Sequence, residues 1–293
     1  IYGASLAFLL AVLVFGVSRG VARRWLVLPV IGQIQPSEFV KISFVFFVAA
    51  MFYQSTDRDT IIKTTVVAAV HVLVLVLSKD LGSALIFFVA YMTMLFVATS
   101  SYLWFGAGIA GGSVAAVAAY YLFPHVRRRV EAWADPWSDI ANKGYQVAQA
   151  LFAIGTGGWF GMGLYRGMPE KIPVVDKDFV FAAISEEMGA LYALCVLFLC
   201  LGCYMQFMMI AMKMQAMFYK LIAFGLGSVY ITQVFLTIGG VTKFIPSTGV
   251  TLPLVSYGGS SIVSTFIIFQ VIQGLYVLKR GEEEEEEHSS EEE

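Results

Sequence analysis

Two acidic residues, Asp176 and Asp178, end the longest polar stretch of the chain, just before an apolar run that begins Phe179-Val-Phe. A carboxylate at the start of a helix is favoured by the helix dipole. Such a group could take a proton from a sugar hydroxyl or help to hold a divalent cation. It could equally cap the helix, and the residues alone leave both interpretations open.

Four ionisable residues fall within apolar stretches, where a charge is costly and by default indicates function. Glu38 and Lys41 are three residues apart, so they can pair on one helix. This pair fits a structural ion pair and a functional site equally well. Glu186 and Glu187 lie inside another apolar run, where a buried ion pair with a neighbouring helix is as reasonable as a catalytic role.

Two other polar residues have simple structural explanations. His71 stands alone in the apolar run 66–77, and we expect a packed, hydrogen-bonded histidine rather than a proton relay. Asp80 lies at a junction between two apolar runs, where its carboxylate would cap the next helix at Ser83. The sequence has no Walker loop, dinucleotide fingerprint or His/Cys metal cluster, so we expect no organic cofactor and no nucleic-acid partner.

Residues 245–261 are too rich in glycine, proline and hydroxyl side chains to form a plain helix. Irregular backbone at membrane depth is tolerated where it is buried in protein or lines a polar cavity. There it could offer N–H and hydroxyl donors to an anionic head group. An ordinary surface loop is the alternative.

The elements that must position these residues are membrane-spanning helices. The chain is 58% hydrophobic and 14% charged, whereas a soluble domain carries about 25% charged residues. A spanning helix needs roughly 20 apolar residues, and the apolar runs do not alternate as the strands of a barrel would. We therefore expect an all-α integral membrane protein, a polytopic bundle of about eight passes. These lie near residues 1–17, 37–54, 61–78, 82–99, 103–123, 179–211, 218–239 and 261–279.

Counting these passes places the connections 18–36, 124–178 and 240–260 at one face of the membrane. The arginines of the first two connections would be cytoplasmic anchors or ligands of a polyanion. Residues 144–154 have the spacing of a short amphipathic helix. The acidic tail 281–293 is expected to be disordered.

Several ordered motifs together resemble the SEDS family of bacterial cell-wall synthesis, the RodA, FtsW and SpoVE proteins. These motifs are Ala22-Arg-Arg-Trp25, Gln35-Pro-Ser-Glu-Phe-Val-Lys41, Asp80-Leu-Gly-Ser83, Trp133-Ala-Asp-Pro-Trp137, Gly144-Tyr-Gln-Val-Ala-Gln149, Ala153-Ile-Gly-Thr-Gly-Gly158, Asp178-Phe-Val-Phe181, Glu186-Glu-Met-Gly189 and Leu252-Pro-Leu-Val-Ser-Tyr-Gly-Gly-Ser260. Each motif alone is weak, but the ordered set is specific.

The resemblance implies a fold and an orientation. Family members typically have ten transmembrane helices, so residues 1–280 would be the last eight of them, without the first two. The protein would be a multi-pass protein of the bacterial cytoplasmic membrane. Loop 124–178 would be extracytoplasmic and the tail 281–293 cytoplasmic, so that the arginine clusters face a lipid-linked substrate.

The resemblance also implies an activity. The family polymerises lipid II into peptidoglycan strands by glycosyl transfer, with undecaprenyl pyrophosphate leaving, in elongation, division or sporulation. Asp178 takes the place of the family's essential aspartate, with Mg²⁺ or Mn²⁺ as the cation that would assist it. A class B penicillin-binding protein would be the partner, besides membrane lipids. The expected substrate-binding residues are Arg23, Arg24, Trp25, Gln35, Glu38, Lys41, Tyr145, Gln146, Gln149, Ser256, Gly258, Gly259 and Ser260.

One motif departs from the family pattern. Many members read Leu-Pro-Glu-x-His-Thr-Asp-Phe where this chain has Ile172-Pro-Val-Val-Asp-Lys-Asp-Phe179. Roles of the missing Glu and His cannot be carried over to Val174 and Asp176, although Asp176 could be an auxiliary acid. Two other functions also remain compatible with the sequence. One is a scaffold for the penicillin-binding protein, and the other is a lipid II flippase with a charged path through Glu38, Lys41, His71 and Glu186.

Overall fold

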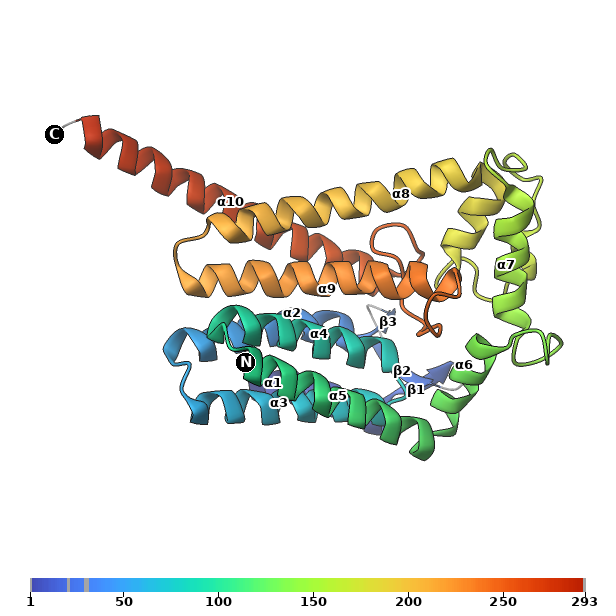
Figure 1. Cartoon of the computed structure of the whole chain (residues 1–293), viewed down its shortest axis with the longest axis horizontal. Coiled ribbons are helices and arrows are strands. Elements are labelled where there is room, and N and C mark those ends of the chain that lie inside the picture. The colour runs from blue at the N-terminus through green and yellow to red at the C-terminus, as the bar shows by residue number, and fades with distance from the viewer. Residues whose placement is uncertain (1, 20–21, 29–31, 292–293) are drawn as a thin grey trace.

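A computed structural model describes residues 2–19, 22–28 and 32–291 as a bundle of antiparallel helices (Figure 1). The helices are α1 (Tyr2–Phe15), α2 (Pro36–Gln54), α3 (Arg58–Leu77), α4 (Leu81–Thr99), α5 (Tyr102–Leu122), α6 (Pro124–Ala134), α7 (Tyr145–Gly157), α8 (Val180–Lys213), α9 (Met217–Val241) and α10 (Gly259–Glu291). Among the described residues, seven helices are long and apolar enough to cross a membrane, namely α2, α3, α4, α5, α8, α9 and the part of α10 up to Gly281. Helix α1 is apolar but has 14 residues. The expected all-α membrane fold is confirmed.

Helix α9 is the central helix, packed against α2, α4 and α8. Small residues on α9 allow this close packing. A Cβ atom at Gly225 would lie 2.6 Å from the Val45 side chain of α2 and 2.8 Å from Met94 of α4. Figure 1 shows α2–α5 on one side of α9 and α8 with α10 on the other. The bundle is therefore built around α9, most of whose surface is buried by its neighbours.

The polar connections gather at one end of the bundle, as the count of passes predicts. Strands, α6, α7 and the loop after α9 all lie at the right of Figure 1. Hydrogen bonds tie them together across the end. Arg129 Nη1 of α6 donates to Ser247 O at 2.8 Å, and Trp133 Nε1 donates to Lys243 O at 3.1 Å. Helix α6 thus lies across the loop that follows α9 and is hydrogen-bonded to it.

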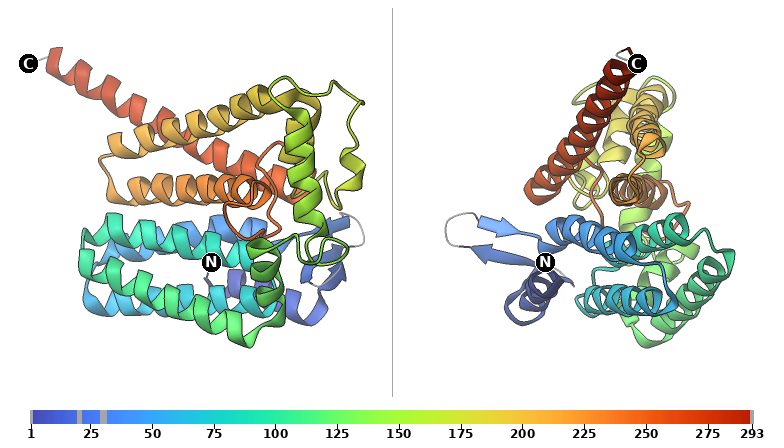
Figure 2. Two further views of the ribbon diagram at one scale, coloured as in Figure 1. Left: turned by 45° about the vertical axis from the view of Figure 1, so that its right-hand side comes forward. Right: turned by 90° about the vertical axis from the view of Figure 1, so that its left-hand side faces the viewer.

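The connection 18–36 contains a small sheet that the sequence analysis did not predict. Strands β1 (Val17–Arg19), β2 (Ala22–Leu28) and β3 (Gly32–Ile34) are antiparallel in the order β1-β2-β3, and part of this sheet projects from the side of the bundle in the right-hand view of Figure 2. In a connection between two helices, the backbone N–H and C=O groups lack the partners that a helix would provide. Strand pairing provides them here, and the Trp-Leu-Val-Leu run of β2 has a high propensity for a strand.

The other long connection and the tail are more helical than the sequence indicated. Helix α7 confirms the amphipathic helix expected near residues 144–154, whereas α6 was not predicted. The tail was expected to be disordered, but α10 continues through it to Glu291 and projects beyond the other helices (Figure 1). Glutamate is a good helix former, and extending an existing helix costs far less than nucleating a new one.

Candidate functional site

Asp178 lies two residues before the first residue of α8, Val180, and hydrophobic anchors hold the chain on either side of it. Phe179, the N-cap residue of α8, is 1% exposed. It packs with Ala150 and Ala153 of α7 and with Ile172. Val175 packs on the same cluster from the other side of Asp178. The Asp178 side chain is itself partly exposed, so a fixed backbone presents a carboxylate that solvent can reach.

The loop between α9 and α10 is bonded directly to the segment that carries Asp178. Tyr257 N donates to Asp176 O at 2.8 Å, and Ser256 Oγ donates to Lys177 O at 2.5 Å. Ser256 Oγ also accepts the N–H of Leu252 at 2.8 Å, which shapes the loop itself. The structure therefore places Ser256 beside the backbone of the two acidic residues. The Asp176 side chain is exposed.

The start of α2 joins the same end of the bundle. Gln35 N donates to Ser260 Oγ of α10 at 3.0 Å, and the Gln35 amide lies 3.4 Å from Asp80 Oδ2. Asp80 caps α4 as expected, since its carboxylate accepts Ser83 N and Ser83 Oγ. Gly258 and Gly259 precede Ser260 at the start of α10. Two separate sequence motifs, around residues 35 and 260, are thus parts of one structure.

Glu38 and Lys41 form a buried ion pair with further polar partners on α9 and α10. Lys41 Nζ lies 2.6 Å from Glu38 Oε2 and donates to Gln233 Oε1 of α9 at 2.7 Å. Ser264 Oγ of α10 donates to Glu38 Oε2 at 2.7 Å. Gln233 Nε2 in turn donates to Thr251 O at 3.0 Å. The network connects α2, α9, α10 and the loop between the last two helices.

His71 is packed and hydrogen-bonded, as predicted. Its ring packs against both Phe44 and Phe87, and Nδ1 is 2.9 Å from Val67 O. No part of the side chain is exposed. This histidine therefore belongs to the core of α2, α3 and α4.

Helix α7 crosses the ends of α8 and α9 (Figure 1) and carries three of the predicted substrate-binding residues. Tyr145 is its first residue and is partly buried. Gln146 Nε2 donates to Pro173 O at 2.8 Å, which holds the segment before Asp178. Gln149, one turn further on, lines a pocket of about 250 Å³. These residues belong to the same end of the bundle as Asp178.

Helix α8 is interrupted at Gly189, which has φ +85°. A Cβ atom there would lie 2.4 Å from the nitrogen of Gly161, so only glycine fits this approach. Residues 158–163 fill the break with main-chain hydrogen bonds. Met162 N donates to Glu186 O and Gly163 N donates to Glu187 O, each at 2.9 Å, and Ala190 N donates to Gly158 O at 2.9 Å.

The Glu186 and Glu187 side chains hold the loop that follows residue 163. Met168 N donates to Glu186 Oε1 at 3.1 Å, and Tyr165 N donates to Glu187 Oε1 at 3.0 Å. Each carboxylate accepts a backbone N–H from the loop, so these contacts take the place of the ion pair with a neighbouring helix, one of the two roles that the sequence left open.

The arginine motif of the first connection can be followed only in part. Arg23 and Arg24 belong to strand β2, and Arg23 pairs with Ser18, but their side chains lie outside the part that the structure describes. Trp25 pairs with Val17 across the sheet and is partly buried. The predicted contact of these residues with a substrate stays a prediction.

Sequence reasoning missed the partners of the buried ion pair and the basic residues of the pocket. Gln233 sits in an apolar helix, and a polar residue at such a position is a signal that could have been followed. Thr251, Ser261 and Ser264 looked like ordinary hydroxyls. Arg166 and Lys171 line the pocket, and their spacing in the chain gave no indication of it.

The divalent cation expected from the sequence has Asp178 as its candidate protein ligand. Within the described residues, no group of three or more His, Cys, Asp or Glu side chains is placed to hold a metal ion. Mg²⁺ commonly binds through one or two carboxylates together with substrate phosphates and water. Asp178 fits the part of one such carboxylate.

Comparison with known sequences gives relatives across nearly the whole chain. Peptidoglycan glycosyltransferase RodA of Mycobacterium tuberculosis H37Rv is 35% identical over 267 residues, which are 86% of this chain and 57% of RodA. The probable peptidoglycan glycosyltransferase FtsW of Aliivibrio salmonicida is 36% identical over 269 residues, 88% of this chain and 67% of FtsW. The chain thus spans little more than half the length of the RodA relative.

Solved structures agree with the sequence comparison. A chain from a peptidoglycan synthase complex, described for its coordination of polymerization and crosslinking, superimposes with a TM-score of 0.76 at 27% identity, over 94% of this chain and 79% of that one. The rod shape determining protein RodA of Thermus thermophilus gives 0.65 at 27% identity, over 92% and 74%. A family model of cell cycle proteins matches residues 1–280. This multi-pass membrane protein therefore belongs to the FtsW, RodA and SpoVE family of cell cycle proteins.

Proposed function

We propose that this protein is a peptidoglycan glycosyltransferase that polymerises lipid II into glycan strands for cell elongation, division or sporulation. The names of the RodA and FtsW relatives support the activity. The observation that carries the proposal is the position of Asp178. It is a partly exposed carboxylate on an anchored backbone, at the end of the bundle where the polar connections meet.

The chemistry requires one general base. Asp178 takes the proton of the acceptor's GlcNAc 4-hydroxyl, whose oxygen then attacks the anomeric carbon of the donor MurNAc. The bond from that carbon to the pyrophosphate oxygen breaks, and undecaprenyl pyrophosphate leaves with its electron pair. Attack on the face opposite the leaving group inverts the anomeric centre, so no covalent enzyme intermediate is needed. A positioned base of this kind contributes about 10²–10⁴-fold to a rate.

The negative charge of the substrate's pyrophosphate must also be stabilised. Donors from the loop 252–260 and basic side chains of this end would bind the pyrophosphate. A divalent cation held between Asp178 and the phosphates would neutralise the charge of the leaving group. The residues of α7 and the segment 169–178 would orient the sugars.

The proposed orientation places this end of the bundle outside the cytoplasm, where lipid-linked sugars reach the cell wall. Loop 124–178 is then extracytoplasmic, and the end of α10 lies in the cytoplasm. The structural neighbour from a peptidoglycan synthase complex supports a partner of the class B penicillin-binding type, which would crosslink the strands.

The test is polymerisation of fluorescent lipid II by the purified protein with Mg²⁺ or Mn²⁺. Asp178→Asn removes the base and keeps the size of the side chain, so we expect polymer formation to fall by at least about 100-fold. Glu170→Gln is the matched control, because Glu170 is an exposed acid of the same connection. Full activity of Asp178→Asn, with an unchanged melting temperature, would overturn the assignment of the base.

The flippase alternative needs charged groups exposed along a path through the membrane. Glu38 and Lys41 are 4% and 2% exposed and bonded to one another, and His71 lies in the core. These contacts favour a structural role for the three residues. Transport of labelled lipid II across vesicles by Asp178→Asn protein, without polymer formation by the wild type, would support the flippase instead.

A further inference from the structure

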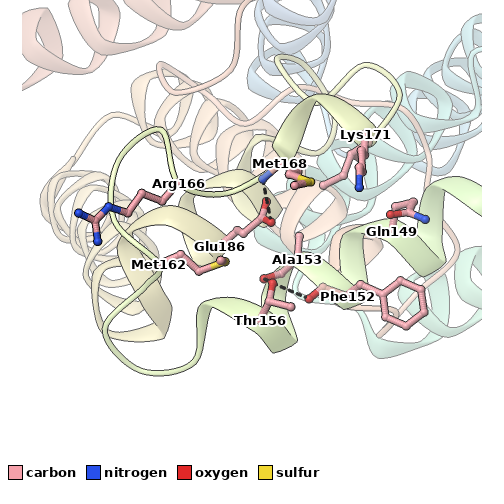
Figure 3. Close-up of a pocket in the computed structure, with 10 residues that line it drawn as sticks. Gln149, Phe152, Ala153, Thr156, Met162, Arg166, Met168, Lys171 and Glu186 are labelled. Atoms are coloured by element: carbon pink, nitrogen blue, oxygen red, sulfur yellow. Dashed lines mark hydrogen bonds between the residues drawn. The ribbon is translucent and has the colours of Figure 1, made fainter.

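A pocket of about 250 Å³ lies between α7, the start of α8 and the loop that joins them. Figure 3 shows its labelled side chains around Glu186. The lining residues are Gln149, Phe152, Ala153, Thr156, Met162, Arg166, Met168, Lys171, Ile172 and Glu186. Asp178 is not among them, so the pocket is separate from the proposed reaction centre. Both belong to the same end of the bundle.

Glu186 has an unused hydrogen-bonding atom in this pocket. Its side chain is 7% exposed, and Oε1 accepts the N–H of Met168 at 3.1 Å. Oε2 is shielded from solvent and has no hydrogen-bond partner. Nearly all buried polar atoms in proteins are bonded, and an exception calls for an explanation. A ligand that donates a hydrogen bond to Oε2 would supply one.

The charges around the pocket restrict what that ligand can be. A free cation would be repelled by Arg166 and Lys171, whereas a phosphate would be repelled by the Glu186 carboxylate. In Figure 3 the Arg166 side chain extends away from Glu186, so the two do not neutralise each other. A neutral ligand with O–H or N–H donors meets neither obstacle.

The rest of the lining suits a ring with one apolar face. Phe152, Met162 and Met168 provide apolar surface. Gln149 offers both a donor and an acceptor. Thr156 Oγ1 donates to Phe152 O and Ala153 O at 3.0 Å each, which leaves its oxygen free to accept. Carbohydrates combine these features, because hydroxyls surround a ring whose C–H groups form an apolar face.

We propose that this pocket is a saccharide subsite, which holds one sugar ring of the glycan through a hydroxyl or acetamido N–H bonded to Glu186 Oε2. The choice of an N-acetylated sugar rests on the proposed function. Glu186 follows Asp178 by eight residues in the chain, and the six helical steps from Val180 to Glu186 correspond to roughly 9 Å along the axis of α8. The ring bound here would therefore be a neighbour of the reacting sugar, and Glu186 would be a positioning residue.

The test is a calorimetric titration of the purified full chain with chitotetraose, a soluble tetramer of N-acetylglucosamine. No turnover is required, so the result does not depend on the role of Asp178. We expect saturable binding by the wild type. Glu186→Gln should weaken it by about tenfold or more, because a hydrogen bond to a charged acceptor is lost. Glu187→Gln is the matched control, since Glu187 holds the same loop but does not line the pocket.

A second variant guards against a folding effect at the buried position. Phe152 is 49% exposed, so Phe152→Ala should leave the melting temperature almost unchanged while it weakens chitotetraose binding. Three results would each overturn the proposal: no binding by the wild type, equal binding by wild type and Glu186→Gln, or an equal loss in Glu187→Gln. Displacement of the sugar by inorganic pyrophosphate would show an anion site instead.

Discussion

Two buried glutamates of this chain differ in how completely their carboxylates are bonded. Glu38 is 4% exposed and Glu186 is 7% exposed. Oε2 of Glu38 receives both the Lys41 ammonium and the Ser264 hydroxyl. Glu186 receives one backbone N–H at Oε1, and its Oε2 receives none. The first carboxylate lies among helices of the bundle, and the second lies where α7 covers the break in α8.

The comparison separates two roles that burial alone does not distinguish. The Glu38 carboxylate belongs to a network that joins α2, α9 and α10, which fixes those helices relative to one another. A carboxylate with an unbonded oxygen beside a cavity can still accept a hydrogen bond from a ligand that enters the cavity. The remaining hydrogen-bonding capacity, rather than the exposed fraction, indicates where a substrate would bind.

The largest expected effect comes from breaking the satisfied pair. Lys41→Met keeps the length of the side chain but leaves the Glu38 charge without its counter-ion. Removing one partner of a buried pair costs about 3–5 kcal/mol, so the thermal unfolding transition in detergent should fall clearly. The double variant Glu38→Gln/Lys41→Met has no buried charge and should recover much of the loss. A single variant as stable as the wild type would contradict a structural role for this pair.

A smaller effect is expected from the break in α8 at Gly189, three residues after Glu186. Gly189→Ala forces a side chain into a backbone with φ +85° and against the nitrogen of Gly161 at 2.4 Å. A strained backbone of this kind costs about 1–3 kcal/mol. Gly202→Ala on the same helix is the control, because a Cβ there meets nothing within 4 Å, and it should raise stability by up to about 1 kcal/mol. Melting curves that rank the two variants the other way would refute the interpretation of the break.

The smallest effect on stability is expected at Glu186 itself. Glu186→Gln keeps an acceptor for Met168 N and removes a buried negative charge that has one hydrogen bond. Its unfolding free energy should therefore stay within about 1 kcal/mol of the wild type, unlike that of Lys41→Met. Chemical denaturation of the two variants measures the difference. A loss at Glu186 as large as that at Lys41 would remove the distinction between the two sites.

The sequence predicted the features that depend on local pattern. Long apolar runs marked the helices of the bundle, because a bilayer requires such runs whatever their neighbours are. Asp80 was expected to cap α4 and does so. The spacing of Tyr145, Gln149 and Phe152 predicted α7. The strands of residues 17–34 and helix α6 were missed, because short elements at the end of a bundle are stabilised by contacts that the local sequence does not show.

The site was harder to predict because its contacts join distant parts of the chain. The motif near residue 35 and the motif near residue 260 looked independent, yet Gln35 N and Ser260 Oγ are 3.0 Å apart. Glu186 was seen as a costly charge, but the apolar helical run concealed the break at Gly189 that follows it. A glycine directly after two acidic residues in such a run was the available signal.

The hydrogen bonds from the loop after α9 to the segment before Asp178 are accepted by the carbonyl oxygens of residues 176 and 177. Every amino acid supplies the same carbonyl, so replacing the side chains of Asp176 and Lys177 leaves these two hydrogen bonds intact. The side chains next to Asp178 can therefore change while these hydrogen bonds keep its backbone in position. Variation at positions 176 and 177 then costs little in folding.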